Sequence, residues 1–489
     1  MKNIKILFLS LFVGSVLTSC SNDSEDFTDN PAVTATTEET SKELDVENFI
    51  FRGMSDIYLY KDDMEVLGEN YFSSQAEKEA YLETFSSPEK LFNSLKSSRD
   101  RYSYLIDNYE EIKSGVSASS GETGMAFGLV SFCNSCPEVF GYVKLVLPNT
   151  PAFEQGVERG MIFNRVNGQQ LTRSNINSLL SSSSFSIGLA KIENNTLTEI
   201  DETYQISSRE TNVNPVVISK VMEVEGTKTG YLFYYSFNED FDENLNAAFG
   251  EFKTEGVTEL ILDLRYNGGG SVRTATDLAA MITGQFAGEV FMKEEWNEKY
   301  QSYYEERNPQ SLLNKFNTSI RTGTTINNLN LSRVFVITTK SSASASELII
   351  NGLDPYIDVV QIGDVTTGKF EASVAIYDSP NYSKDNPSLN DKHTYAVQPL
   401  VLKSMNKDGV TDYKDGIQPE IKLEEDVLNL GKLGNIEEPL TKVALDVILG
   451  NRVSIPEVKT YVNFGESGMF EVNFQTMYID SRDLPEFEK

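Results

Sequence analysis

Histidine, cysteine and tryptophan are scarce in this chain of 489 residues, which has one histidine, three cysteines and one tryptophan. A structural zinc site normally takes four cysteine or histidine ligands, and Cys133, Cys136 and His393 supply three at most. A Ser-His-Asp hydrolase would have to use His393, which stands in no motif of its own. We therefore predict no metal and no cofactor.

Basic residues are also in the minority, because 42 Lys and Arg stand against 73 Asp and Glu, for a net charge of −31 at pH 7. A nucleic-acid-binding protein neutralises phosphates with a basic stripe, and none stands out along the chain. We predict no nucleic-acid partner and an acidic surface that serves solubility. The hydrophobic share of 39% is ordinary for a folded protein, and the length suggests about three domains.

The apolar run at the start of the chain is too short to span a bilayer, which takes about 20 residues. Lys2 and Lys5 precede it, residues 6–16 form it, and Leu-Thr-Ser-Cys ends it at Cys20. This pattern resembles a lipoprotein signal peptide more than a buried helix. The resemblance implies that residues 1–19 are removed and that Cys20 carries a lipid, which makes the membrane a partner through this anchor.

A polar tether is expected in residues 20–43, which are nearly free of large apolar groups. Its acidic residues Asp23, Glu25 and Asp26 resemble the export signals of surface lipoproteins. We expect a protein of the cell envelope that is anchored to the outer membrane. The sequence leaves both a periplasmic and a surface-exposed location open.

The other two cysteines, Cys133 and Cys136, are separated by Asn-Ser and have β-like sequence on both sides. A structural disulfide near a hairpin tip, or a pair of free thiols, is favoured over a redox site. The choice between disulfide and thiols stays open at this point.

Residues 44–113 have the pattern of a small helical domain. A second helix of this domain is predicted over residues 88–95, where Ser87 can cap the first turn. The first helix shows apolar residues at helical spacing: Ile50, Met54, Ile57 and Tyr58.

Residues 114–210 contain short β-like runs and resemble a PDZ domain. Met161 departs from the resemblance, because such domains often carry Asp there. The resemblance implies that Phe127, Gly128 and Leu129 bind peptide: an extended C-terminal peptide adds as a strand beside residues 129–132, with its carboxylate close to the amides of Phe127 and Gly128. The matching features are the Gly128-Leu129 start of a strand, the Thr-Pro-Ala start of a helix at Thr150, and the hairpin Val-Asn-Gly that ends at Gly168.

Residues 211–455 alternate strands and helices, which is the pattern of an α/β domain. The tail, residues 456–489, has some alternating β pattern and stays unassigned. Strands are predicted over residues 257–264, 333–339 and 358–362, and helices over residues 274–282 and 343–353.

Two of these strands end in unusual sequence. The first runs into Leu-Asp-Leu-Arg-Tyr-Asn-Gly-Gly-Gly, which ends at Gly270, and the second runs on into Ser-Ala-Ser-Glu, which begins at Ser344. Both precede a predicted helix start, where backbone N–H groups are unpaired. A Thr-Gly-Lys turn then ends at Lys369, 25 residues after Ser344.

With these three pieces in this order, residues 45–455 resemble the C-terminal processing (tail-specific) serine peptidases. The resemblance implies a crotonase/ClpP-like β-α catalytic core, with Ser344 as the nucleophile and Lys369 as its base. A serine hydroxyl needs a neighbour that takes its proton, and a lysine can do so only where its surroundings lower its pKa toward neutrality. Proteins or peptides with exposed C-termini are then the expected partners.

The oxyanion of a tetrahedral intermediate needs preorganised donors, and the resemblance implies the N–H groups of Gly269 and Ala345. We expect the hydroxyl of Ser373 to orient Lys369, and no catalytic role for Asp354. Three positions depart from the pattern of the family: Gly268 stands where Pro is frequent, Ser373 where a lysine-orienting Gln is frequent, and Pro355 where Asp is frequent.

Two rival interpretations are weaker. A penicillin-binding enzyme could use Ser87 and Lys90 with the Lys-Thr-Gly that ends at Gly230, but no Ser-Asp-Asn lies between them. A non-catalytic surface lipoprotein could bind peptides through the PDZ-like domain alone, and the intact Ser344 and Lys369 argue against it. The sequence therefore predicts a lipid-anchored serine endopeptidase that acts near the C-termini of unfolded or tagged proteins.

Overall fold

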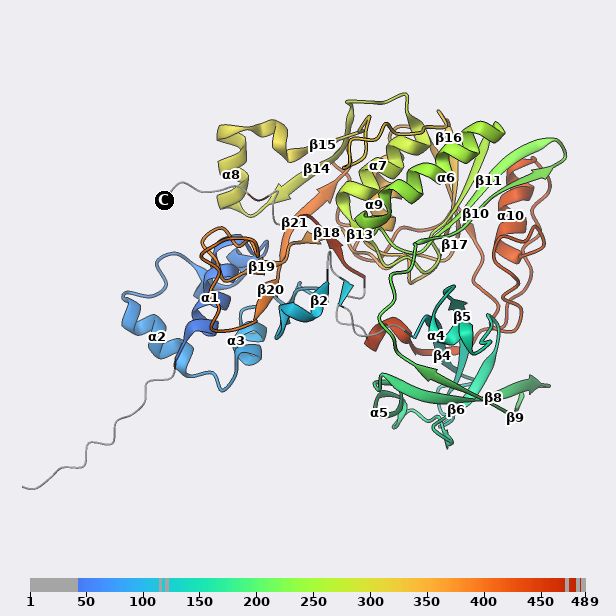
Figure 1. The fold of residues 1–489 in the computed structure, drawn as a ribbon, viewed down its shortest axis with the longest axis horizontal. Coiled ribbons are helices and arrows are strands. Elements are labelled where there is room, and N and C mark those ends of the chain that lie inside the picture. Colours follow the sequence, from blue (N-terminus) through green and yellow to red (C-terminus); the bar gives the residue numbers. More distant parts are fainter. Residues whose placement is uncertain (1–42, 114–116, 119–122, 471–474, 481–483, 485–489) are drawn as a thin grey trace, which may run out of the picture. The chain divides into compact units, whose positions relative to one another are not determined.

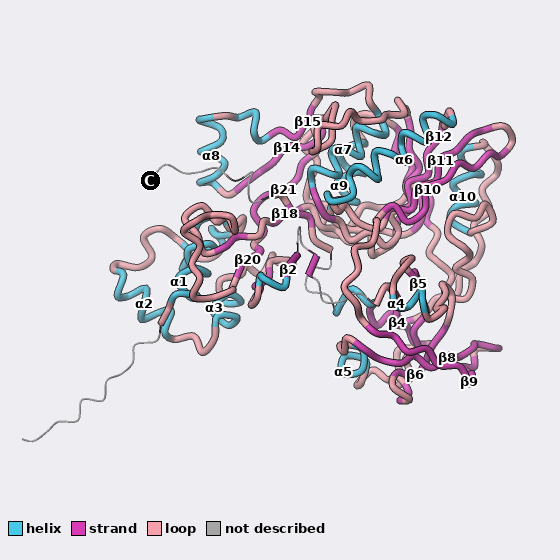
Figure 2. The backbone as a smooth tube through the Cα atoms, viewed as in Figure 1, coloured by secondary structure: helices cyan, strands magenta, loops and turns pink. Residues whose placement is uncertain are grey.

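The described part of the chain begins at residue 43 (Figures 1 and 2). The predicted signal peptide, Cys20 and nearly all of the predicted tether lie outside it. No helix within this part is long and apolar enough to cross a bilayer. The computed structural model describes residues 43–113, 117–118, 123–470, 475–480 and 484.

The N-terminal region, residues 44–113, is mostly helical. Helix α1 (Asp45–Ile57) buries the predicted apolar stripe, and α2 (Gln75–Glu83) follows it. The second predicted helix is α3 (Pro88–Ser94), where the Ser87 side chain accepts the Lys90 N–H at 3.4 Å. The short strand β1 (Tyr104–Ile106) was not predicted, because three residues are too few to show a β period; it pairs with the distant β20 (Ala396–Gln398).

The β-sheet region, residues 123–210, forms one antiparallel sheet. The predicted turn before Gly168 is present, with positive φ at Asn167 and Gly168, and it joins β6 to the short β7 (Gln169–Gln170). Two short helices, α4 (Pro151–Glu154) and α5 (Ile176–Leu180), lie beside the sheet. Its main strands are β4 (Met125–Ser131), β5 (Phe140–Val146), β6 (Ile162–Val166), β8 (Ser184–Glu193) and β9 (Thr196–Ser207).

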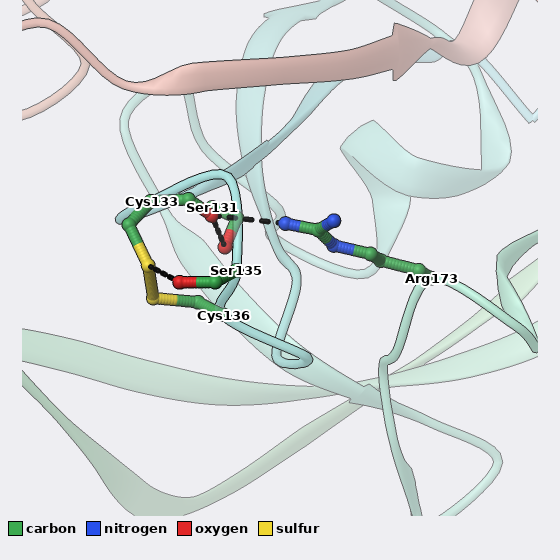
Figure 3. The surroundings of a disulfide bond; sticks show 5 residues. All are labelled: Ser131, Cys133, Ser135, Cys136 and Arg173. Carbon is green, nitrogen blue, oxygen red and sulfur yellow. Dashed lines mark hydrogen bonds between the residues drawn. A yellow bond between two sulfur atoms is a disulfide. The ribbon is translucent and has the colours of Figure 1, made fainter.

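The two cysteines of this region form a disulfide, which closes the connection between β4 and β5 (Figure 3). Within this turn the N–H of Cys136 donates to the carbonyl of Cys133. The guanidinium of Arg173 donates to the same carbonyl at 2.9 Å. The sequence left a disulfide and a pair of free thiols open, and the structure has the disulfide. Arg173 connects it to a neighbouring loop.

A six-stranded sheet forms the centre of the α/β region. Five of its strands are parallel, namely β11 (Thr227–Tyr234), β12 (Glu259–Asp263), β16 (Arg333–Thr338), β17 (Asp358–Gly363) and β22 (Ile421–Lys422), and β10 (Val216–Val224) is antiparallel. Helices α6 (Asp242–Glu255), α7 (Val272–Thr283) and α9 (Ala345–Leu353) cover one face, and α10 (Pro439–Ile448) covers the other (Figure 1).

The alternation of apolar side chains explains these layers. Leu260 and Leu262 pack with α6, α7 and α9, whereas Ile261 packs with α10. A strand that is buried on both faces has a continuous apolar sequence, which is the pattern from which residues 257–264 were predicted as a strand. The predicted α/β architecture is therefore confirmed.

A second sheet lies beside the first and includes part of the tail. The tail forms β23 (Val462–Glu466), which pairs with β4, the 3-10 helix η6 (Ser467–Phe470), and β24 (Met477–Tyr478). The region also has α8 (Glu298–Arg307) and β19 (Ile376–Tyr377). The order of the second sheet is β13 (Gly270–Ser271), β24, β18 (Glu371–Ser373), β21 (Leu400–Met405), β14 (Val290–Trp296) and β15 (Leu313–Lys315).

Candidate active site

The two strands with unusual ends are neighbours in the central sheet. Strands β12 and β16 run parallel, with Ile261 opposite Phe335, so their carboxyl ends meet at one edge. The loop after β12, residues 264–269, therefore lies against the start of α9. The carbonyl of Asn267 accepts the Ala343 N–H at 3.0 Å and the Ser346 hydroxyl at 2.9 Å, which fixes this contact.

Ser344 stands at the N-cap of α9 in an unusual conformation. Its φ is 66° and its ψ is −114°, a region that residues other than glycine rarely adopt. The side chain is completely buried, and its Oγ has no hydrogen-bond partner among the described residues. A strained backbone at a buried polar residue is a feature of functional sites.

A buried carboxylate ties Ser344 to the turn that contains Lys369. Glu347 accepts the N–H of Ser344 at 2.7 Å and the N–H of Lys369 at 2.8 Å. It also accepts the Gly368 N–H at 2.6 Å and the Thr366 hydroxyl at 2.5 Å. Burial raises the pKa of Glu347, and these hydrogen bonds oppose the rise. Glu347 was not predicted as a site residue, although a Glu three residues after a Ser at a helix start is the signature of a capping box.

Lys369 is buried, with 1% of its surface exposed. Burial lowers its pKa to about 7, although the acidic side chains of Glu371, Asp100 and Glu347 act in the opposite direction. Its amine lies 4.6 Å from the centre of the Tyr102 ring. A lysine with this pKa has a substantial neutral fraction at physiological pH, which is the form that can accept a proton.

The glycine before Lys369 is required by close packing. Gly368 has a φ of 88°, and a Cβ added to it would lie 2.3 Å from the carbonyl oxygen of Lys414. Only glycine fits this conformation and this space. The turn thereby brings the Lys369 N–H to Glu347.

The amine of Lys369 donates to a carbonyl of the tail. Its Nζ lies 2.8 Å from the carbonyl oxygen of Gln475, and no hydrogen bond joins it to Ser344 within the described structure. The structure thus brings the two predicted catalytic residues to one site through Glu347. In this structure the Lys369 amine binds the tail.

The predicted oxyanion residues also lie at this site. A Cβ added to Gly269 would lie 2.7 Å from the Ser344 Cβ and 3.1 Å from the Ala345 nitrogen, so this loop touches the helix start. The Gly269 N–H donates to the side-chain oxygen of Asn267 at 2.9 Å. In this structure the Gly269 N–H, one of the two predicted oxyanion donors, is therefore bound to the side chain of Asn267. Asn267 was missed because nothing in a Tyr-Asn-Gly sequence shows which backbone group its side chain will bind.

The hydrogen bond expected between Ser373 and Lys369 is not present in this structure. The Ser373 hydroxyl donates to the Met477 carbonyl at 3.0 Å and accepts from the Gln398 side chain at 3.0 Å, and it makes no hydrogen bond to Lys369. The reason is geometric: Ser373 lies on β18, which pairs with β24, so its side chain meets the tail strand. In this structure the Ser373 hydroxyl therefore binds the tail, and its orienting role stays a prediction.

A buried ionic cluster fixes the loop after β12. The side chain of Arg265 is completely buried and pairs with Asp263 at 2.8 Å and with Glu438 at 2.7 Å. Glu425 belongs to the same cluster, because it forms ion pairs with Arg265 and with Arg159 of the β-sheet region. These two cations lower the pKa of Glu425 to about 2. A movement of the loop that broke these pairs would leave a buried charge unpaired, at a cost of roughly 3–5 kcal/mol. The cluster therefore holds the loop after β12 in place.

The predicted peptide-binding edge of β4 is paired with the tail. Strand β23 runs antiparallel to β4, with Gly465 opposite Leu129 and Glu466 opposite Gly128. The Phe127 N–H, predicted to meet a peptide carboxylate, donates to the hydroxyl of Ser467 at 3.2 Å. This edge therefore takes an extended segment, and in this state the segment comes from the same chain.

The alternatives to the lysine mechanism find no support in the geometry. His393 contacts Asp378 at 3.1 Å and stacks against Phe49, and no serine is among its hydrogen-bond partners in the described structure. Ser87 is occupied as the cap of α3. The described residues also contain no group of three or more His, Cys, Asp and Glu that could hold a metal ion.

Fold and site together are those of a serine-type peptidase. A parallel sheet carries a strained serine at a helix start, next to a buried lysine and to the loop of residues 264–269 (the glycine loop). The sequence profile of Peptidase family S41 matches residues 228–423, and that of the Peptidase S41 N-terminal domain matches residues 45–104. The chain therefore contains the domains of peptidase family S41.

Two relatives and one solved structure illustrate the similarity. The chain is 23% identical over 235 residues to the chloroplastic C-terminal processing peptidase of Tetradesmus obliquus, covering 46% of this chain and 44% of that protein. It is 22% identical over 417 residues to the carboxy-terminal processing protease CtpB of Bacillus subtilis (strain 168), covering 84% of this chain and 74% of that protein. A candidate S41 protease from Bacteroides fragilis NCTC 9343 superimposes with a TM-score of 0.64 at 25% identity, covering 82% of this chain and 97% of the other.

Proposed function

We propose that this chain is a lipid-anchored serine endopeptidase of the cell envelope that cleaves unfolded or tagged proteins near their C-termini. Residues 211–455 are the crotonase/ClpP-like core, and residues 114–210 are a PDZ-like domain that recruits C-termini. Cys20 carries the lipid after residues 1–19 are removed. The names of the two C-terminal processing relatives support the substrate class.

The observation that carries the proposal is the burial of Lys369 in a turn that shares the carboxylate of Glu347 with Ser344. The neutral amine takes the proton of the Ser344 hydroxyl as the oxygen attacks the peptide carbonyl. The resulting ammonium then gives its proton to the leaving amine, and a water molecule hydrolyses the acyl-enzyme by the same route.

The oxyanion of each tetrahedral intermediate is stabilised by the N–H groups of Ala345 and Gly269. For this, the Gly269 N–H has to leave the side chain of Asn267, and the amine of Lys369 has to leave the carbonyl of Gln475. The described state is therefore a resting state of the enzyme in this proposal.

Hydrolysis of an unfolded protein tests the proposal. Ser344→Ala and Lys369→Ala should each abolish detectable turnover, because general-base help is worth about 10²–10⁴-fold. Lys369→Arg should fail as well, since a guanidinium keeps its proton at any working pH. His393→Ala is the matched control and should keep most of the activity. Full activity in Lys369→Ala, or its loss in a folded His393→Ala, would contradict the mechanism.

A further inference from the structure

The tail passes between the two halves of the candidate site. Strand β24 pairs in parallel with β13, which follows the glycine loop, and with β18, which follows Lys369. The register places Met477 opposite Gly270, and the Met477 side chain is completely buried. An extended peptide that entered between the glycine loop and the base would need these same two strand edges.

The tail backbone also contacts the groups that would do the chemistry. The carbonyl of Gln475 accepts the Lys369 amine at 2.8 Å, in place of a serine hydroxyl. A Cβ added to Gly268 would lie 3.2 Å from the Gln475 nitrogen, and one added to Gly269 would lie 3.0 Å from the Thr476 carbonyl oxygen. Gln475 itself has a positive φ of 63°, which is unfavourable for a residue other than glycine. The tail thus bends into the site and approaches both glycines closely.

A second part of the same tail fills the peptide edge of the β-sheet region. Beyond the backbone pairing of β23 with β4, the carboxylate of Glu466 forms an ion pair with Lys144 of β5. The same carboxylate accepts the Ser341 hydroxyl at 2.6 Å, and Lys144 donates to that hydroxyl at 3.0 Å. Ser341 stands three residues before Ser344, so an acidic residue in the peptide edge is connected directly to the loop that carries the nucleophile.

We propose that the C-terminal tail is a built-in competitive inhibitor, which occupies the peptide edge through residues 462–466 and the catalytic site through residues 475–479. The proposal rests on the proposed function and adds its regulation. An extended substrate segment displaces the tail, and one with an acidic side chain at the position of Glu466 competes best, since it regains the contacts to Lys144 and Ser341.

A substrate displaces the tail only if it binds tightly enough to compete with a segment of the same chain. A segment tethered to its own site acts at an effective concentration of about millimolar, so weak or short peptides do not displace it. A protein that presents a long extended segment to both places at once does displace it. The tail thereby selects unfolded chains over short peptides.

A reversible lock on the tail tests this proposal. Val130 on β4 and Asn463 on β23 lie opposite each other, so Val130→Cys with Asn463→Cys can form a disulfide in a chain whose three native cysteines are replaced by serine. Oxidation should lower the hydrolysis of an unfolded protein by at least about tenfold, and reduction should restore it. The matched control is Lys191→Cys with Thr198→Cys, an exposed pair between β8 and β9 that should show no change.

Equal activity of the locked chain before and after reduction would overturn the inhibitor proposal and leave the proposed function intact. Absence of turnover in the native and the reduced chain would instead refute the proposed function. In that case amide hydrogen exchange decides the inference, with a synthetic peptide of the sequence 460–470 as the probe, added well above the effective concentration of the tethered tail, which is about millimolar. Faster exchange in residues 462–466 on addition of the peptide supports displacement, and unchanged exchange overturns it.

Discussion

The two walls of the candidate site are built in different ways. On one wall, Ser344 and Lys369 are tied through the carboxylate of Glu347 by hydrogen bonds of 2.7 and 2.8 Å. On the other wall, the Gly269 N–H is engaged by Asn267, and the tail carbonyl of Gln475 holds the amine. In the proposed mechanism the backbone at Ser344 and Lys369 is therefore preassembled, whereas the Gly269 N–H, the Lys369 amine and the substrate path depend on contacts that have to change. In this proposal, activation changes the second wall and frees the amine of Lys369, while the anchor at Glu347 stays as it is.

The largest effect is expected from breaking the preassembled wall. Glu347→Ala removes the acceptor of four hydrogen bonds, so the starts of α9 and of the lysine turn lose their common anchor. We expect the turnover number to fall by at least about 10²-fold, because hydrogen bonds to a buried charged group are worth about 1.5–3 kcal/mol each.

Steady-state kinetics together with thermal unfolding distinguish a loss of positioning of the catalytic groups from a loss of stability of the fold. A loss of positioning appears mainly in the turnover number, with a changed pH profile, in a protein that is still folded at the assay temperature. Near-native turnover in a folded Glu347→Ala would show that the two residues do not need this anchor. Glu347→Gln, which keeps one oxygen, should be intermediate.

The pH dependence of the rate reports the electrostatics of the same wall. Burial lowers the pKa of Lys369 from its ordinary value of 10.5 to about 7, and only the neutral amine can act as base. The rate should therefore be flat above pH 7 and fall about tenfold per unit below it. The linked stability has a definite sign. Between about pH 7 and 10.5 the unfolded chain binds more protons than the folded one, so this residue makes stability rise with pH in that window.

Glu371→Gln sharpens this measurement. Glu371 is the acidic neighbour that raises the pKa of Lys369 most, so its neutralisation should shift the rate profile to lower pH without breaking the anchor at Glu347. A profile that stayed in place, or that moved to higher pH, would argue against Lys369 as the titrating base.

The smallest effect is expected at Ser373, which belongs to the wall that moves. Its hydroxyl binds the carbonyl of Met477 on the tail and not the amine of Lys369. Ser373→Ala should therefore change the rate by less than about tenfold and leave the apparent pKa of the rate profile unchanged. A shifted apparent pKa would restore the lysine-orienting role that the sequence suggested.

Local patterns in the sequence were sufficient for much of this molecule. The apolar strands, the helix that begins after Ser344, the cap at Ser87 and the turn at Gly368 follow from short-range rules, because backbone conformation and burial on both faces leave their mark on neighbouring residues. Ser344, Lys369, Gly269 and Ala345 were named from motifs that resemble those of a known family, and the structure brings all four to one edge of the sheet.

Contacts between distant residues were decided only by the tertiary structure. The pairing of β23 with β4 and of β24 with β13 and β18 joins residues more than a hundred positions apart, and a two-residue strand carries no period that could predict its partner. The same reason applies to Ser373, whose hydroxyl was expected from the family resemblance to orient Lys369 and in this structure binds a tail strand. A side chain's chemistry is set by its residue type, but its partner is set by what the fold packs against it.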